Sequence, residues 1–110
     1  MNINTALRKL SAMKGKFFID DLGSIRHRRR LVSKYRYHRG TRIKLCPLNA
    51  ICPKPIEGNE VESIARQLDM DSEEADLFAS AADIRRDSDE GEVYKLRRRI
   101  LRAVGLKEKP

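Results

Sequence analysis

The chain contains no tryptophan, and only three phenylalanines and three tyrosines among its 110 residues. Charged residues make up 36% of the sequence, well above the roughly 25% that is usual for globular proteins, so we expect a hydrophobic core of modest size. A chain of this length is enough for one compact domain and too short for two ordinary ones. We therefore expect residues 1–110 to form a single domain, with a basic helix and hairpin in residues 1–54 and a helical core in residues 55–110.

Long apolar runs are absent as well. No stretch of the sequence approaches the roughly 18 apolar residues that a membrane span needs, and the N-terminus lacks an uninterrupted apolar signal region. The two cysteines do not make a disulfide framework. We expect a protein that is not bound to a membrane, and the cytoplasm is its simplest location.

The sequence also lacks the motifs that carry catalysis. It contains no Gly-rich phosphate loop, no nucleophile elbow and no HExxH string. Cys46 and Cys52, with His27 and His38, raise a zinc hypothesis, but their spacing does not fit a zinc finger and a proline follows each cysteine. Two small buried thiols at a loop are the favoured interpretation. We expect no enzymatic activity, no cofactor and no metal.

Charge is distributed very unevenly along the chain. Residues 1–54 hold 14 Lys and Arg against two acidic residues, whereas residues 55–94 hold 13 Asp and Glu against three arginines. Residues 95–110 are basic again, with seven Lys and Arg against one glutamate. Such segregation indicates either opposed faces, one of which meets a polyanion, or basic and acidic segments that pack together and neutralise each other.

The first half of the chain predicts a helix followed by a hairpin. Apolar residues recur at helical steps from Asn4 to about Lys14, with Asn4 as the N-cap and Gly15 as the stop. Phe17–Ile19, a turn at Asp20–Gly23 and weak alternation around Ile25 and His27 then favour a hairpin. Alternation returns at Thr41–Leu45, so we expect two or three antiparallel strands with a basic tip at Leu31–Gly40.

The second half is helical in pattern. Pro47 suits the first position of a short helix that ends before Cys52-Pro53. Asn59 with Glu62, and Asp71 with Glu74, resemble capping boxes at the start of two further helices. A polar loop at Asp83–Glu90 precedes the clearest helix, for which we expect Asp89 as the cap and Gly105 as the left-handed C-cap, with Leu106 packing back. Its apolar stripe consists of Val93, Leu96, Ile100, Leu101 and Val104.

The segment from Ser63 to Phe78 resembles a helix-turn-helix motif. Ile64 and Leu68 would hold its first helix, Met70 would plug the turn, and Asp69 takes the place of the usual turn glycine. The second helix carries four acidic residues and no cation, so each carboxylate would repel a phosphate. We therefore favour two antiparallel helices joined by a short capped turn over a helix that enters the major groove.

The candidates for nucleic-acid binding lie elsewhere. One group is a cationic run with interleaved tyrosines, in which cations neutralise phosphates and rings stack on bases: Arg28, Arg29, Arg30, Lys34, Tyr35, Arg36, Tyr37, Arg39 and Arg42. The other group lies opposite the apolar stripe of the last helix: Lys95, Arg98, Arg99 and Arg102. A solvated hairpin and the solvated back of a helix would account for the same residues without a ligand.

A family resemblance covers the last two thirds of the chain. Cys46-Pro47-Leu48-Asn49-Ala50, the capped helices, and the ending from Arg98 to Leu106 look like a group of small uncharacterised bacterial and phage proteins. The resemblance implies no activity.

Together these features predict a mainly α fold with a small antiparallel β-hairpin and a helix-turn-helix-like or winged-helix-like three-helix core. The leading function is that of a small nucleic-acid-associated protein, such as a DNA-binding regulator, that meets DNA or RNA with its hairpin and the back of its last helix. The alternative is an interaction module that docks a charged partner or a second copy of itself as a homo-oligomer. An anionic membrane surface ranks third, because no amphipathic helix pairs its cations with bulky aromatics.

Overall fold

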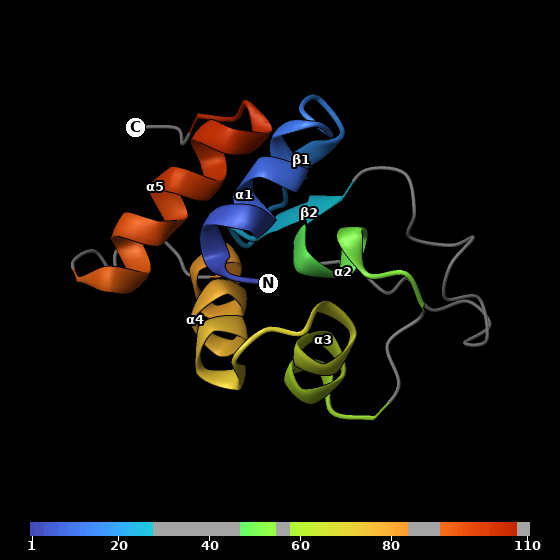
Figure 1. The fold of residues 1–110 in the computed structure, drawn as a ribbon. Helices are drawn as coiled ribbons and strands as arrows, with labels where there is room; N and C mark the ends of the chain where they lie inside the picture. The colour runs from blue at the N-terminus through green and yellow to red at the C-terminus, as the bar shows by residue number, and fades with distance from the viewer. Residues whose placement is uncertain (28–46, 55–57, 84–90, 108–110) are drawn as a thin grey trace, which may run out of the picture.

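The computed structural model of the protein describes residues 1–27, 47–54, 58–83 and 91–107 (Figure 1). Within them the fold is mainly α with one small antiparallel sheet, as the sequence predicts. In chain order the elements are α1 (Ile3–Ser11), β1 (Phe17–Ile19), β2 (Ile25–His27), α2 (Pro47–Ile51), α3 (Glu60–Leu68), α4 (Ser72–Asp83) and α5 (Glu92–Val104).

Helix α1 begins two residues earlier than the sequence prediction and ends sooner. Its N-cap is Asn2, whose Oδ1 accepts a hydrogen bond from the backbone N–H of Thr5 at 2.9 Å. The expected cap, Asn4, lies inside the first turn, so that prediction is wrong. The helix ends at Ser11 with Ala12 as its C-cap, ahead of the predicted stop at Gly15. The earlier start brings Ile3 into the helix, where it packs against the core on the same face as the buried Leu7.

Strands β1 and β2 form the predicted hairpin. Phe17 pairs with His27, and Ile19 pairs with Ile25. The turn is closed by Asp20, whose Oδ1 accepts from the backbone N–H groups of Leu22 at 3.0 Å and Ser24 at 2.9 Å. The hairpin faces the core with Phe17 and His27, whose rings meet edge to face at 5.1 Å. The predicted third strand and basic tip lie outside the described residues.

Four predicted boundaries in the middle of the chain are confirmed. Helix α2 begins at Pro47 and ends before Cys52 and Pro53. In α3, Asn59 is the N-cap, and its Oδ1 accepts from the backbone N–H of Glu62 at 3.0 Å. Asp71 does the same for α4 by accepting from the N–H of Glu73 at 2.7 Å.

A tight turn joins α3 to α4. Asp69 is its left-handed residue, with φ of 50°, and its backbone N–H donates to the last carbonyls of α3. Met70 is buried in the turn, as the sequence predicts, and so are Ala75 and Phe78 on α4. The buried positions agree with both interpretations of this segment, a helix-turn-helix and a plain helical pair.

Helix α5 follows Gly91, which occupies the N-cap without a side-chain hydrogen bond. The prediction of Asp89 as the cap is therefore wrong, and Asp89 itself lies outside the described residues. The predicted C-cap is confirmed. Gly105 adopts φ of 81°, and the N–H of Leu106 donates to the carbonyl of Leu101 at 2.8 Å. This is the Schellman pattern, in which Leu106 packs back onto the core.

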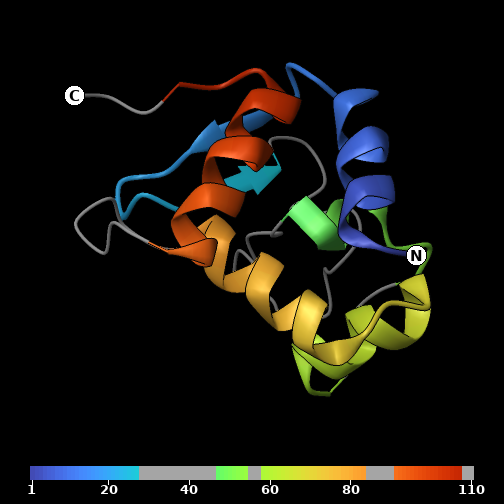
Figure 2. The same ribbon diagram turned by 60° about the vertical axis from the view of Figure 1, so that its left-hand side comes forward.

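Helix α5 packs against α4 on one side and α1 on the other, and α2 is enclosed between α1, α4 and β2 (Figures 1 and 2). Buried side chains from both halves of the sequence join in one hydrophobic core. Fully buried Leu10 and Ile25 come from the basic half, and Ile64, Phe78 and Ile100 come from the rest of the chain. The core therefore fixes where the outer sides of α1 and α5 lie relative to each other.

Candidate nucleic-acid interface

The predicted binding residues divide into two groups. Nine of them, from Arg28 to Arg42, lie outside the described residues. The other four belong to α5, and all four are exposed: Lys95, Arg98, Arg99 and Arg102. We call these four the α5 basic ridge.

The ridge lies on the solvent side of α5 because its residues fall at three- and four-residue steps from one another. The same helix buries Leu96, Ile100 and Val104 on its other side. In the part of the chain that the structure describes, the ion pairs belong to Arg26, which contacts Asp20 at 3.5 Å and Asp83 at 3.1 Å. No ridge residue takes part in an ion pair there. The charge of the ridge is therefore open to solvent rather than neutralised by the acidic helices.

Two ridge arginines are held by neighbouring side chains. The guanidinium of Arg98 lies over the ring of Tyr94, 5.0 Å from its centroid. Arg99 donates a hydrogen bond to Oδ1 of Asn4, so Asn4 serves the contact between α1 and α5 instead of capping α1. Neither contact neutralises charge, because the tyrosine ring and the asparagine amide are both uncharged.

Helix α1 extends the positive surface beyond α5. Arg8 is exposed and lies one turn after Asn4 on the same side of α1. Lys14 is exposed as well, and its side chain passes close to the backbone of Gly105, where an added Cβ would lie 2.8 Å from the Lys14 Cγ. The backbone N–H of Gly15 reaches the carbonyl of Val104 at 3.4 Å. Arg8 and Lys14 are thus exposed cations of the segment that packs against α5, and we call them, together with the four ridge residues, the two-helix basic surface.

Sequence reasoning missed Arg8 on α1 and Lys14, which lies three residues beyond the end of that helix. Both stand in a segment already known to be basic, but no periodicity links α1 to α5 across more than 80 residues of chain. The contact depends on tertiary packing through Asn4 and Arg99.

One group of exposed acidic residues lies away from the ridge. Exposed carboxylates occur at the start of α3 and at the start of α4: Glu60, Glu62, Asp71, Glu73 and Asp76. In Figure 1, α3 and the start of α4 lie at the bottom, whereas α5 lies at the upper left, and Figure 2 gives the same separation. This acidic group and the ridge therefore lie on separate surfaces, whereas Glu92 at the start of α5 and Asp83 at the end of α4 are exposed carboxylates outside the group.

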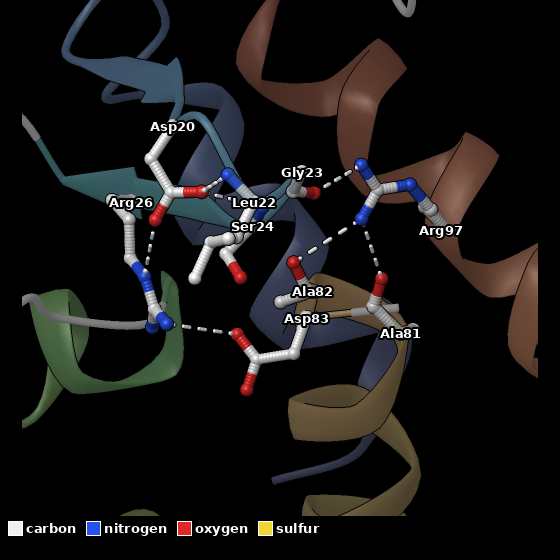
Figure 3. Close-up of polar contacts among 9 residues, drawn as sticks. All are labelled: Asp20, Leu22, Gly23, Ser24, Arg26, Ala81, Ala82, Asp83 and Arg97. Carbon is white, nitrogen blue, oxygen red and sulfur yellow. Dashed lines mark hydrogen bonds and ion pairs between the residues drawn. The ribbon is translucent and has the colours of Figure 1, made fainter. Parts of the chain in front are cut away.

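One arginine of α5 is not part of the ridge. Arg97 is fully buried, and its guanidinium donates to the carbonyls of Ala81 and Ala82 at 3.2 Å each and of Gly23 at 2.6 Å (Figure 3). Arg97 therefore acts within the core, and only the remaining cations of α5 face outward.

The zinc hypothesis gains no support from the described residues. His27 and Cys52 are both buried, with His27 against Phe17 in the core. Cys46 and His38 lie outside the described residues. Among the residues that the structure describes, no group of three or more His, Cys, Asp or Glu side chains is arranged to hold a metal ion.

Comparison with known proteins adds no family. Neither a protein-family model, nor a curated protein, nor a solved structure matches the chain. The resemblance to small bacterial and phage proteins stays a prediction. None of the described helices is both long and apolar enough to cross a membrane.

Proposed function

We propose that this protein is a small, non-enzymatic nucleic-acid-binding protein that holds phosphate groups on its two-helix basic surface. The observation that carries the proposal is the α5 basic ridge. Its four cations are exposed, and none of them pairs with a carboxylate of the described residues. The cations predicted from Arg28 to Arg42 belong to the same proposal as a second contact surface, on the strength of their sequence pattern alone.

The dimensions of the ridge suit a phosphate backbone. Lys95 and Arg102 are seven residues apart, which corresponds to about 10 Å along a helix. Duplex DNA carries about six phosphate charges over that length. Each phosphate that a cation neutralises releases condensed counterions, so binding should weaken steeply as salt rises. The held guanidinium groups of Arg98 and Arg99 lose less conformational entropy on binding than free side chains would.

The test is salt-dependent binding measured by fluorescence anisotropy, with a labelled oligonucleotide of about 20 nucleotides as a single strand and as a duplex. The variant Lys95→Gln/Arg98→Gln/Arg102→Gln removes three ridge cations. Because three phosphate contacts are lost, we expect the affinity to fall about 100-fold near 0.1 M salt. The affinity should also depend less steeply on salt concentration.

The matched control is Lys9→Gln/Lys54→Gln/Arg66→Gln, which removes the same charge from exposed positions away from the ridge. It should weaken binding only slightly. Equal weakening by the two variants would mean that net charge alone attracts the nucleic acid, and no binding at low salt would end the proposal.

A second candidate is self-association, in which the ridge of one copy meets the acidic ends of α3 and α4 on another. The separation of the ridge from that acidic group favours it, because the basic surface of one copy can meet the acidic surface of the next in a head-to-tail contact. This candidate predicts a mass that rises with concentration in light scattering and falls with salt. A constant monomer mass would rule it out.

A further inference from the structure

Next to the ridge, the surface of α5 is hollowed into an open depression of about 500 Å³. Its apolar walls come from Tyr94, Leu101 and Leu106. Its cations are two ridge residues, Arg98 and Arg102, and Lys107 just beyond the C-cap. Among the residues that the structure describes, no carboxylate lines the depression. Its volume is within the range of small-ligand sites.

The Schellman turn at the end of α5 creates this shape. After Gly105 reverses the chain, Leu106 folds back onto the last turn of the helix, and its side chain forms one wall. Tyr94 lies about two helical turns earlier on the same side as Leu101, and forms the opposite part of the wall. The walls formed by Leu101 and Tyr94 have fixed positions. Leu101 is buried, and the ring of Tyr94 lies against the guanidinium of Arg98.

We propose that the depression receives a base of a single-stranded nucleic acid whose phosphates lie along the ridge. This inference rests on the proposed function and specifies its substrate class. The described part of the rim supplies cations and no acid, which favours an anionic occupant. The floor is apolar and partly aromatic, so the occupant must also carry a flat apolar group next to its charge. A nucleotide combines the two, with a base one sugar away from each phosphate.

The open shape favours a planar group over a chain. An acyl chain or an apolar peptide side chain gains binding free energy mainly by burying its whole apolar surface, which requires enclosure on all sides. A base, in contrast, needs only one accessible ring on which to stack. Tyr94 with Arg98 offers such a platform, because bases stack on tyrosine rings and on guanidinium planes. Bases inside a duplex are stacked on one another and would leave the depression empty.

The test compares three probes at several salt concentrations: an unstructured single strand, the duplex of the same sequence, and inorganic polyphosphate, which has no bases. Tyr94→Leu removes the ring without changing charge. We expect it to weaken single-strand binding about tenfold, as loss of one stacked base does. The salt dependence of single-strand binding, and the affinities for duplex and polyphosphate, should stay unchanged.

Two further variants separate stacking from charge. Tyr94→Phe keeps the ring and should retain single-strand affinity. Arg98→Gln should reduce the magnitude of the salt slope by about 0.7 for a single strand, which Tyr94→Leu should not do. Thermal unfolding of each variant shows whether it has folded, because Tyr94 is partly buried.

The outcomes distinguish this inference from the proposed function. If Tyr94→Leu leaves single-strand affinity unchanged, or weakens all three probes alike, the base site is wrong while phosphate binding by the ridge stands. If Tyr94→Leu changes self-association instead, the depression holds a second copy of the chain. If no probe binds at low salt, the proposed function itself fails.

Discussion

The guanidinium of Arg97 donates a 2.6 Å hydrogen bond to the carbonyl of Gly23, a residue 74 positions earlier in the chain (Figure 3). Its other terminal nitrogen donates to the carbonyls of Ala81 and Ala82 near the end of α4. Those carbonyls lie in the last turn of the helix, where the backbone lacks intrahelical donors, and a cation there also complements the helix dipole. One side chain thus ties α5, α4 and the hairpin turn together, and holds α5 in the orientation that points the ridge outward.

Replacing Arg97 should destabilise the protein strongly. Arg97→Met keeps much of the side-chain length but leaves three carbonyls without their donor, and the contacts with Ala81 and Ala82 are buried. We expect the free energy of unfolding to fall by about 3 kcal/mol or more, because each unsatisfied buried group costs about 1–3 kcal/mol. Urea denaturation measures the change. Arg98→Met is the matched control on the exposed side and should stay within about 0.5 kcal/mol of the parent protein; equal losses for the two variants would contradict the structural role of Arg97.

The cap of α1 offers a second test. Asn2→Ala should lower the free energy of unfolding by about 1 kcal/mol, because it removes the acceptor for the Thr5 N–H. Asn4→Ala should lower the free energy of unfolding by only a few tenths of a kcal/mol, since an exposed side-chain hydrogen bond to Arg99 contributes little to stability. The two variants are compared in the same denaturation experiment. If Asn4→Ala lowers the free energy of unfolding more than Asn2→Ala does, the N-cap of α1 is Asn4, as the sequence alone predicted.

The comparison of Asn2 with Asn4 shows where sequence reasoning succeeds and where it stops. The hairpin turn at Asp20, the caps at Asn59 and Asp71, and the C-cap at Gly105 follow from local chemistry, and the structure confirms all four. Two asparagines two residues apart have the same local chemistry, so the choice between them depends on which start lets Ile3 reach the core.

Arg97 shows the same limit on α5. Its position, four residues before Leu101 and seven before Val104, places it on the buried side of the helix. An arginine is rarely fully buried unless it has partners, and its partners here come from α4 and the hairpin turn. No pattern within α5 could supply them. For the same reason, the sequence predicts the ridge on α5 but not the part of the two-helix basic surface that Arg8 and Lys14 supply.

The turn between α3 and α4 provides a stabilising variant. Asp69 holds a left-handed conformation with φ of 50°, and it stands at a helix C-terminus, where a negative charge opposes the helix dipole. Asp69→Gly should raise the free energy of unfolding by about 1 kcal/mol, measured by urea denaturation. Asp69→Asn removes the charge and tolerates the same backbone, so it isolates the electrostatic part. If Asp69→Asn gives the whole gain, backbone strain at this residue contributes nothing.

A final prediction tests whether α1 and α5 act as one binding surface. Arg8 and Lys9 are neighbours on α1 and both are exposed, but they point about 100° apart around the helix. Arg8 lies on the side of Asn4, which contacts Arg99 of the ridge, whereas Lys9 lies away from it. Arg8→Gln should therefore reduce the magnitude of the salt slope for duplex binding by about 0.9, as loss of one phosphate contact does. Lys9→Gln should leave the slope nearly unchanged, although it removes the same charge one residue away.

The measurement is anisotropy over a salt series, and both variants should unfold at the same temperature as the parent protein, because both side chains are exposed. If Arg8→Gln reduces the salt slope no more than Lys9→Gln does, α1 is not part of the interface and the phosphate contacts are confined to α5.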